Sequence, residues 1–396
     1  MEQSERRYDI DALRVLAFGL LILYHIGMYY VADWDWHIKS DRTSVALQDG
    51  MILSNLWRMS LLFFISGMAL ALVQHKYRPG QLLALRARRL LVPLLLGMVV
   101  ICAPQMYWQL VWQQGYDQSF WAFWPQYLNP GTSLYPNQQS AIGLLTWNHL
   151  WYLPYLFCYS LVLLALARPL RWLAARPLAQ KLGLWPALML ACAALMGIWL
   201  WLRADFPSTH ALLDDWYNHG KYLLVMVLGY FFVCQRRLWD ATIAKRWWLL
   251  MLALLAYGVI IAERHGAFAG VDGDALWVRL VWGAVLSLNH WCWLLAVLGF
   301  GGRWLNRPWP WLNYANEAVL PWYMLHQTLI ILAAVYLHGL ALPLWLEVPA
   351  LLGLTLAGCA LGFEIVRRVA LLRWLFGLKA KAAATPRPLQ ARQNSY

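Results

Sequence analysis

The chain has 396 residues, of which 61% are hydrophobic and only 13% are charged. Soluble domains are about half apolar and about one quarter charged, so this composition excludes a soluble protein and predicts an integral membrane protein. The formal net charge of +13 does not predict a nucleic-acid-binding protein, because the Lys and Arg residues lie between apolar runs and not on one soluble face.

Ten apolar runs are long enough to cross a bilayer, since a hydrocarbon core about 30 Å thick requires roughly 20 helical residues. They predict an all-α polytopic fold, a single bundle of about ten transmembrane helices forming one domain over residues 1–378. Residues 379–396, rich in Ala, Pro, Arg and Gln, are predicted to be a disordered cytoplasmic tail. The predicted spans are 12–31, 52–74, 90–112, 148–167, 184–202, 218–234, 247–263, 277–300, 317–337 and 347–367.

The first span contains Arg14 and His25. Eleven residues correspond to three helical turns plus about 20° and to a rise of about 16.5 Å, so the two side chains share one helix face. With the N-terminus inside, Arg14 lies near the inner boundary and His25 near the middle of the membrane. Ionisable groups inside spans are functional candidates, although a snorkelling arginine and a core histidine bonded to a carbonyl are the structural alternative.

Polar and aromatic residues also flank the outer ends of the first two spans. Asp35, Trp36 and His37 follow the first span and form a candidate sugar-binding segment, with a solvated loop carrying an interfacial Trp as the alternative. Arg58 lies near the outer end of the second span, where it either reaches the interface or pairs within a central cavity. The run 63–67 contains the small residues Ser and Gly, which favour close helix packing.

Arg86 and Arg89 lie at the inner entrance to the third span. Their i, i+3 spacing puts them on one helix face. Two neighbouring guanidinium groups repel each other unless an anion lies between them, and Arg is suited to bidentate phosphate binding. The pair is therefore a candidate phosphate site, with ordinary cytoplasmic positive charge as the alternative.

The longest predicted outer loop covers residues 113–147, where Pro125, Pro130 and Pro136 are expected to prevent a regular helix. Its aromatic residues indicate a membrane-interface belt or, alternatively, a platform that stacks on carbohydrate. These rings are Trp121, Trp124, Tyr127 and Tyr135.

Polar residues mark the starts of the fourth and ninth spans. His149 and Trp151 open the fourth span, and Glu317 opens the ninth, which also contains Pro321 and His326. Glu317 and His326 are nine residues apart, so on a straight helix they face opposite directions and need not be partners. A kink at Pro321 would create a polar notch, with ordinary packing around the kink as the alternative.

The Lys and Arg residues set the predicted orientation. With the N-terminus inside, most of the 32 Lys and Arg residues fall on the inner side, as the positive-inside rule requires, and an even number of spans returns the C-terminus to the cytoplasm. The six cysteines all lie in apolar runs without a C-x-x-C pair, so neither disulfides nor a zinc site are expected.

Five segments in this order, on a frame of ten spans, resemble the acyltransferase family 3 membrane proteins. Within that family, the Trp36-His37 pair, the Arg58-Met59 pair and the segment 363–377 resemble members assigned to the succinylation of periplasmic glucans. The five segments are Arg14 with His25, residues 63–67, Arg86 with Arg89, residues 148–153, and residues 314–317 with His326.

The resemblance implies an O-acyltransferase of the bacterial inner membrane. It would move an acetyl or succinyl group from cytoplasmic acyl-CoA to a hydroxyl of a periplasmic or envelope carbohydrate such as a glucan. Its expected partners are acyl-CoA, the carbohydrate acceptor and the lipid bilayer, with no nucleic acid, no metal and no permanently bound cofactor. The sequence leaves the oligomeric state, a homo-oligomer included, undecided.

The roles follow from this chemistry. A neutral imidazole at His25 is suited to act as a general base or to form an acyl-imidazole that relays the group outward. The catalytic candidates are His25, Arg14, Arg58 and His326; the donor-binding candidates are Arg86, Arg89 and Arg14; and the acceptor-binding candidates are Trp36, His37, Asp35, His149, Trp151 and Glu317. A transporter or flippase for a saccharide or lipid-linked saccharide is the main alternative, because buried charges also build translocation paths.

Overall fold

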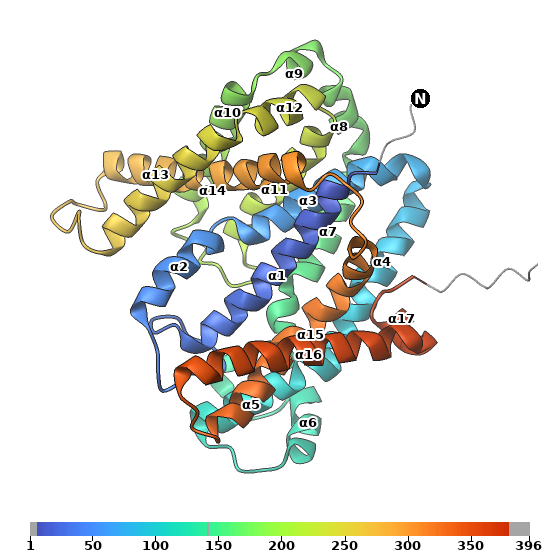
Figure 1. Ribbon diagram of the computed structural model, residues 1–396, viewed down its shortest axis with the longest axis vertical. Coiled ribbons are helices and arrows are strands. Elements are labelled where there is room, and N and C mark those ends of the chain that lie inside the picture. Colours follow the sequence, from blue (N-terminus) through green and yellow to red (C-terminus); the bar gives the residue numbers. More distant parts are fainter. Residues whose placement is uncertain (1–5, 141, 380–396) are drawn as a thin grey trace, which may run out of the picture.

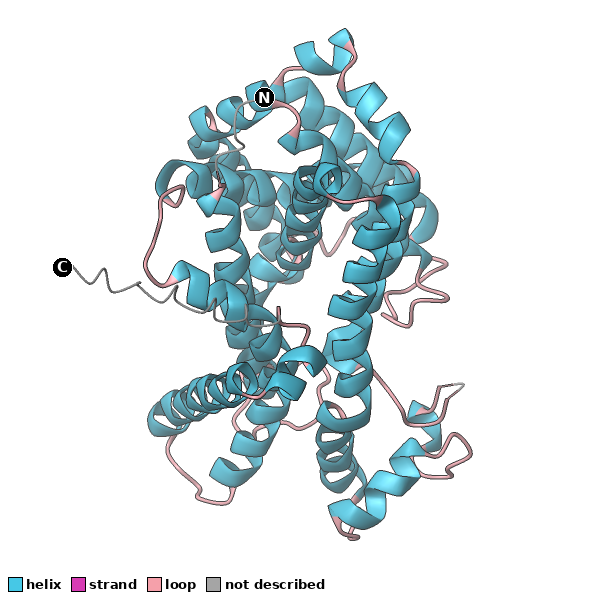
Figure 2. Cartoon of the chain, turned by 90° about the vertical axis from the view of Figure 1, so that its right-hand side faces the viewer, coloured by secondary structure: helices cyan, strands magenta, loops and turns pink. Residues whose placement is uncertain are grey.

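The computed structural model describes residues 6–140 and 142–379, and within these residues the chain forms helices and connecting loops without a β-sheet (Figure 2). The tail predicted at 379–396 lies, apart from Lys379, outside the described residues. The helices are α1 (Tyr8–Tyr30), α2 (Val45–Asn55), α3 (Arg58–Val73), α4 (Pro79–Leu96), α5 (Ala103–Gln114), α6 (Phe120–Leu128), α7 (Tyr152–Ala165), α8 (Ala167–Ala174), α9 (Pro177–Lys181), α10 (Leu184–Leu202), α11 (Trp216–Val233), α12 (Arg236–Ala244), α13 (Arg246–Arg264), α14 (Leu276–Trp304), α15 (Leu312–His338), α16 (Leu344–Arg368) and α17 (Ala370–Leu375).

Each of the ten predicted spans lies on a helix. Among the described residues, eight helical segments are long and apolar enough to cross a membrane, and the bent pair α7–α8, with 67° between its halves, makes nine. The remaining predicted span, 218–234, corresponds to α11, whose first turns contain Asn218, His219 and Lys221 and which packs against the central helix α3. The structure is therefore an all-α polytopic bundle, as predicted.

The segments predicted to be cytoplasmic and those predicted to be outside lie in different parts of the bundle. Figure 1 shows α8, α9, α12, α17 and the N-terminal end of the described chain toward the top and right, whereas α2, α6 and the α13–α14 connection lie toward the left and bottom. The first group contains the segments predicted to be cytoplasmic and the second group those predicted to be outside. The arrangement agrees with an alternating path, while the assignment of the two sides to cytoplasm and exterior stays a prediction.

Close packing of α3 against α11 forms the centre of the bundle. A Cβ atom at Gly67 would lie 2.0 Å from the carbonyl oxygen of Met226, and one at Gly229 would lie 2.2 Å from the carbonyl oxygen of Phe64. Glycine at both positions therefore allows backbone-to-backbone contact, as small residues do between membrane helices. This contact gives Gly67 the packing role that the run 63–67 predicted.

Two of the spans are interrupted. Residues 56–57 separate α2 from α3, so Arg58 is the first residue of α3. A π-helical turn, Gly97–Ile101, joins α4 to α5. Such turns are frequent at functional sites, and this one contributes the Ile101 carbonyl that accepts a hydrogen bond from Thr328 of α15 at 2.7 Å.

The loop 113–147 is more ordered than predicted. It contains the helix α6, which begins after Ser119, whose hydroxyl accepts a hydrogen bond from the Ala122 amide, and which includes Pro125. The expectation that the prolines prevent a regular helix was therefore wrong for residues 120–128. The helix is held by tertiary contacts, because Phe123 and Tyr127 are fully buried and the Tyr127 hydroxyl donates to the Met98 carbonyl at 2.7 Å.

Candidate active site

Three histidines that are distant in the sequence meet in the bundle, and they are called here the histidine cluster: His25 of α1, His149 of the short 3₁₀ turn before α7, and His326 of α15. The helices α1 and α15 pack along each other, which brings His25 Nδ1 to 2.7 Å from His326 Nε2. The ring of His149 stands nearly perpendicular to that of His326, with centroids 5.1 Å apart. The cluster thus combines three of the predicted site residues.

The hydrogen bonds assign the tautomers of His326 and His25. His326 Nδ1 lies 2.8 Å from the Tyr323 carbonyl and 3.1 Å from the Trp322 carbonyl, and a carbonyl only accepts, so Nδ1 carries the proton. In the neutral ring, Nε2 of His326 is then an acceptor, so His25 donates to it through Nδ1–H. Neutral His25 therefore has its lone pair on Nε2.

The free nitrogen of His25 is chemically available. Among the described residues, none forms a hydrogen bond to its Nε2. His25 is half-buried, whereas His149 is 6% exposed and His326 is fully buried. Of the three rings, His25 alone therefore offers both accessible surface and an unprotonated, unbonded nitrogen, which is the arrangement of a general base or nucleophile.

Both ring nitrogens of His149 form hydrogen bonds. Its Nε2 lies 3.1 Å from the carbonyls of both Tyr323 and Met324, so Nε2 carries the proton and Nδ1 accepts, at 3.4 Å, from the side-chain amide of Gln105. No Asp or Glu in the described parts of the chain hydrogen-bonds to any ring of the cluster. Nor do the described residues contain a group of three or more His, Cys, Asp or Glu side chains arranged to hold a metal ion.

Glutamine side chains extend the cluster toward the α1–α2 loop. Gln105 Oε1 accepts from Gln327 at 3.0 Å, and Gln327 Nε2 in turn donates to His37 Nε2 at 2.9 Å. His37 Nδ1 donates to Gln109 Oε1, so the predicted acceptor-binding residue His37 is part of this buried network. We call the chain of residues the amide network, and it consists of Gln105, Gln109, Gln327, His37 and Thr328.

Burial determines the charge state of His37, which lies in the loop between α1 and α2. Removal from water lowers the pKa of His37 to about 4, and its hydrogen bond to Gln109 opposes this shift only in part. His37 is therefore neutral at physiological pH. A neutral ring fits the network, because its Nε2 must accept the hydrogen bond from Gln327.

Arg58 does not reach the surface. It is 3% exposed, and its guanidinium lies 3.6 Å from the centre of the Tyr24 ring, a cation–π contact with the residue that precedes His25. Its hydrogen bond to the Ser54 hydroxyl is long at 3.4 Å, and its guanidinium also interacts with the Tyr24 hydroxyl. Of the two predicted positions for Arg58, the structure has the buried one.

The predicted donor-binding residue Arg86 is linked to the histidine cluster through Tyr152 and Tyr323. Arg86 interacts electrostatically with Arg14, Arg89 and the Tyr152 hydroxyl. That hydroxyl lies 2.7 Å from the Ser66 hydroxyl, and the Tyr152 ring contacts Tyr323 edge-on. Arg14 is half-buried and pairs weakly with Asp11 at 3.5 Å. His25 lies five residues before the end of α1 at Tyr30, and its depth in the membrane stays a prediction.

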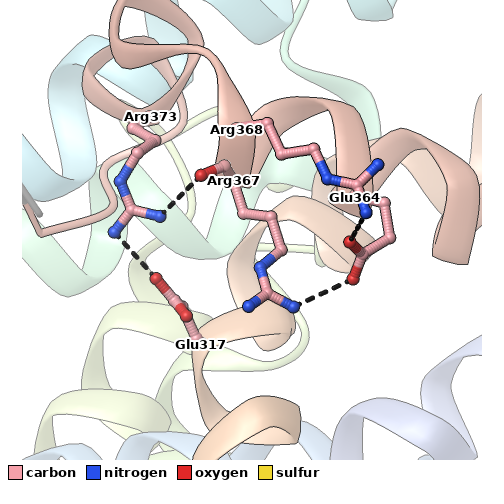
Figure 3. Close-up of a pocket in the computed structure, with 5 residues that line it drawn as sticks. All are labelled: Glu317, Glu364, Arg367, Arg368 and Arg373. Atoms are coloured by element: carbon pink, nitrogen blue, oxygen red, sulfur yellow. Dashed lines mark hydrogen bonds and ion pairs between the residues drawn. The ribbon is translucent and has the colours of Figure 1, made fainter.

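Glu317 belongs to a separate group of ions, the ionic cluster. It pairs with Arg373 at 2.9 Å and lines a cavity of about 440 Å³ at the junction of α15, α16 and α17, with Arg367 and Arg368 directed toward Glu364 (Figure 3). Nine residues along α15 separate Glu317 from His326, a rise of about 13.5 Å. The structure therefore keeps Glu317 away from the histidine cluster, as the opposite-face prediction implied.

The other acceptor-binding candidates, Asp35, Trp36 and Trp151, form no hydrogen bond with the histidine cluster among the described residues. Asp35 is exposed, and Trp36 packs beside the ring of His37. The Trp151 ring lies 4.2 Å from that of His210 and 5.5 Å from that of Tyr222.

Sequence reasoning missed the amide network, although Gln105, Gln327 and Thr328 were visible as polar residues inside the predicted spans 90–112 and 317–337. The sequence reasoning considered only ionisable groups inside the spans. Uncharged amide side chains at the same depth were the signal that would have indicated the network.

The helical bundle is that of a membrane protein, and the comparison with known proteins establishes its class. The acyltransferase domain family matches residues 7–364, so the chain belongs to this family and is a membrane acyltransferase. Similar proteins include Glucans biosynthesis protein C of Escherichia coli (strain K12) and of Shigella dysenteriae serotype 1 (strain Sd197), each 23% identical to the chain over 95% of both sequences. No solved structure matches the chain.

Proposed function

We propose that this enzyme transfers an acyl group from cytoplasmic acyl-CoA to a hydroxyl of a periplasmic or envelope carbohydrate in the bacterial inner membrane, with His25 as the reacting base. The observation that carries the proposal is the accessible, unbonded Nε2 of His25, whose tautomer is fixed by the hydrogen bond to His326. The names of the two relatives support a glucan as the acceptor.

In the direct mechanism, Nε2 of His25 takes the proton of the acceptor hydroxyl while the hydroxyl oxygen attacks the thioester carbonyl. The C–S bond then breaks, and the coenzyme A thiolate takes the proton back from the imidazolium. His326 Nε2 accepts from His25 Nδ1–H throughout, so it stabilises the imidazolium that forms between the two steps. General-base catalysis of this type contributes typically 10²–10⁴-fold.

In the alternative mechanism, Nε2 of His25 itself attacks the thioester. Because Nδ1 keeps its proton, acylation gives an N-acyl-imidazolium, and coenzyme A leaves as the thiolate. The acceptor hydroxyl then attacks the acyl carbon, the C–N bond breaks and the hydroxyl proton goes to the thiolate, so His25 is released as the neutral imidazole. Both mechanisms require the same lone pair, so the geometry supports them equally. They differ in that only the relay forms a covalent acyl-enzyme.

The donor is proposed to enter from the inner side. Coenzyme A is a polyanion, and Arg86 and Arg89 are cations without an ion-pair partner among residues 6–140 and 142–379. The side-chain Nε of Arg89 is also buried and unbonded. Bound phosphates would supply the missing acceptors. Arg14 would steer the pantetheine arm toward Tyr152 and the histidine cluster.

The acceptor is proposed to approach from the opposite side, along the α1–α2 loop. There the amide network brings His37 to the outer end of the histidine cluster, and Gln113 holds the loop backbone by donating to the carbonyls of Trp36 and His37 at 3.1 and 3.2 Å. Amide and imidazole groups of this kind are suited to binding sugar hydroxyls.

The test is acyl transfer by the purified protein in nanodiscs, with acetyl-CoA and succinyl-CoA as donors and an oligoglucan as acceptor. We expect His25→Ala to lower the rate of thioester consumption at least about a hundredfold. The matched control is His75→Ala, which removes an exposed histidine. The double variant Arg86→Ala/Arg89→Ala should raise KM for the donor about tenfold, whereas Arg88→Ala, on the exposed side of the same helix, should leave KM unchanged.

The outcomes distinguish the two mechanisms from each other and also test whether acyl-CoA is the donor. A radiolabelled acyl group that stays on the protein without acceptor, and is lost in His25→Ala, selects the acyl-imidazole relay. Absence of donor binding and of turnover in well-folded wild-type protein would reject acyl-CoA as the donor and leave saccharide transport as the function to examine.

A further inference from the structure

Two cations, Arg58 and Lys221, have no anionic partner among the described residues. Arg58 of α3 is 3% exposed, and Lys221 of α11 is half-buried. Neither forms an ion pair with any Asp or Glu in the part of the chain that the structure describes. Buried charges are ordinarily paired, because transfer of an unpaired ion from water to a low-dielectric interior is costly.

The two cations share one aromatic residue. Lys221 Nζ lies 4.9 Å from the centre of the Tyr222 ring, and Arg58 interacts electrostatically with the Tyr222 and Tyr24 hydroxyls. Tyr24 precedes His25, and their rings lie 5.8 Å apart. Arg58 therefore lies beside the reacting histidine, and Lys221 lies against the Tyr222 ring whose hydroxyl Arg58 also faces, with a further cation, Arg203, near Lys221.

The neighbouring carboxylate is already fully engaged. Asp215 is completely buried and accepts hydrogen bonds from the Tyr155 hydroxyl, the backbone amides of Thr209 and His210, and the Asn218 side chain. These donors occupy both carboxylate oxygens, so Asp215 fixes the loop before α11 and does not form a close pair with Lys221.

Unbonded polar atoms gather at the same place. The Nε of Arg58, the Nε2 of His290 and the Nε1 of Trp293 are all buried without a hydrogen-bond partner. The His290 ring lies near Lys221 and within hydrogen-bonding range of the Leu56 backbone, and Trp293 stacks on Trp57, so these side chains flank the break between α2 and α3. Unsatisfied buried groups are rare, and a set of them on cationic and donor side chains indicates a place for a bound acceptor.

We propose that Arg58 and Lys221 form a binding site for an anionic group, a carboxylate or a phosphate, carried by one of the substrates and held beside His25. This proposal deepens the proposed acyl transfer and rests on it for the identity of the substrates. The group is either a carboxylate at the far end of the acyl chain or a charged substituent of the acceptor saccharide. In both cases two cations supply charge-assisted hydrogen bonds to one anion.

The aromatic side chains around the two cations fit the rest of such a substrate. The Tyr222 ring lies 5.5 Å from the Trp151 ring, and the His210 ring lies 4.2 Å from Trp151, tilted by 37°. Ring faces beside an anion site are suited to a saccharide that carries charge, because the rings bind its apolar faces while the cations select the charged group.

The test measures binding, so it does not depend on turnover. The full-length protein in nanodiscs of neutral phosphatidylcholine is heated with succinate or with glycerol 1-phosphate, and with succinamide or glycerol as uncharged analogues. We expect one of the two anions, and neither analogue, to raise the unfolding midpoint. The shift should disappear in Lys221→Gln and in Arg58→Gln, weaken in Arg58→Lys, and persist in Lys76→Gln and in Arg86→Ala/Arg89→Ala.

The outcome also identifies the source of the anion. A shift with succinate assigns the site to the acyl chain, and a shift with glycerol 1-phosphate assigns it to the acceptor. In transfer assays Lys221→Gln should then raise KM for the charged substrate about ten- to a hundredfold and leave KM for its neutral counterpart within about twofold. Absence of any anion-dependent shift in wild type, or a shift that survives in both Lys221→Gln and Arg58→Gln, would overturn the proposal, even where acyl transfer itself is observed.

Discussion

The two halves of α15 hold polar groups in opposite ways. Near its middle, His326 is fully buried and meets two other imidazoles without a carboxylate bonded to any of them. Near its start, Glu317 retains solvent exposure and belongs to the ionic cluster, in which Arg373, Arg367 and Arg368 are all paired with Glu317 or Glu364. One end is neutral and buried, and the other is charged and open to solvent.

This difference separates a site for chemistry from a site for fixing helices. A carboxylate beside His326 would favour a protonated imidazole, whereas backbone carbonyls and ring nitrogens leave the histidine cluster neutral and preserve the lone pair of His25. The ionic cluster has no such requirement. Its pairs tie α15 to α16 and α17, and each ion already has a partner.

The largest expected effect comes from replacing His326, a positioning residue in the neutral, buried part of α15. In His326→Ala, His25 loses the acceptor that fixes its proton on Nδ1, so the reactive lone pair is no longer held on Nε2. We expect kcat to fall about a hundredfold with KM for the donor nearly unchanged, as in other enzymes that lose the group that orients a catalytic histidine. Steady-state kinetics in nanodiscs measure both constants.

His326→Gln is the matched control, because the amide oxygen can accept from His25 Nδ1–H. Its kcat should lie between those of wild type and His326→Ala, and the pH at which its rate is half-maximal should shift relative to wild type. Equal losses in kcat for the two variants, with no change in the pH profile, would show that the residue acts only through packing.

Much of this contrast could be predicted from the sequence. Helical periodicity placed Arg14 and His25 on one face and put Glu317 and His326 on opposite faces of one helix. Periodicity is local, however, and the contact between His25 and His326 joins residues 301 positions apart, which only the packing of α1 on α15 determines. The unpaired state of Arg58 was equally hidden, since it depends on which carboxylates the fold brings near.

The second prediction concerns His37, where the neutral network meets the loop between α1 and α2. Burial lowers the pKa of His37 to about 4, below the usual value near 6.5, so the unfolded segment takes up a proton over a pH range in which the folded one does not. Stability should therefore fall as the pH is lowered from about 6.5 to about 4, by up to about 3 kcal/mol. Thermal unfolding between pH 7.5 and 4.5 measures this loss.

His37→Gln removes the titrating group and keeps an amide that can bond to Gln109 or Gln327. We expect the variant to lose less stability than wild type over this pH range, with His75→Gln, which changes an exposed histidine, behaving as wild type. Parallel pH curves for wild type and His37→Gln would contradict the assignment of a buried, neutral His37.

The smallest expected effect is at the charged end. Glu317→Gln leaves Arg373 bonded to the carbonyls of Arg367 and Lys379, so we expect a loss of only about 1 kcal/mol, seen as a slightly lower unfolding midpoint. Arg373→Gln should cost more, because Arg373 is 10% exposed in its side chain and makes all of these contacts. Arg368→Gln, whose side chain is 72% exposed, is the control and should leave the unfolding midpoint unchanged.

The double variant Glu317→Gln/Arg373→Gln tests whether the two side chains act as a pair. If it loses as much stability as the two single variants together, they do not, and the ionic cluster does not tie the start of α15 to α17 through them.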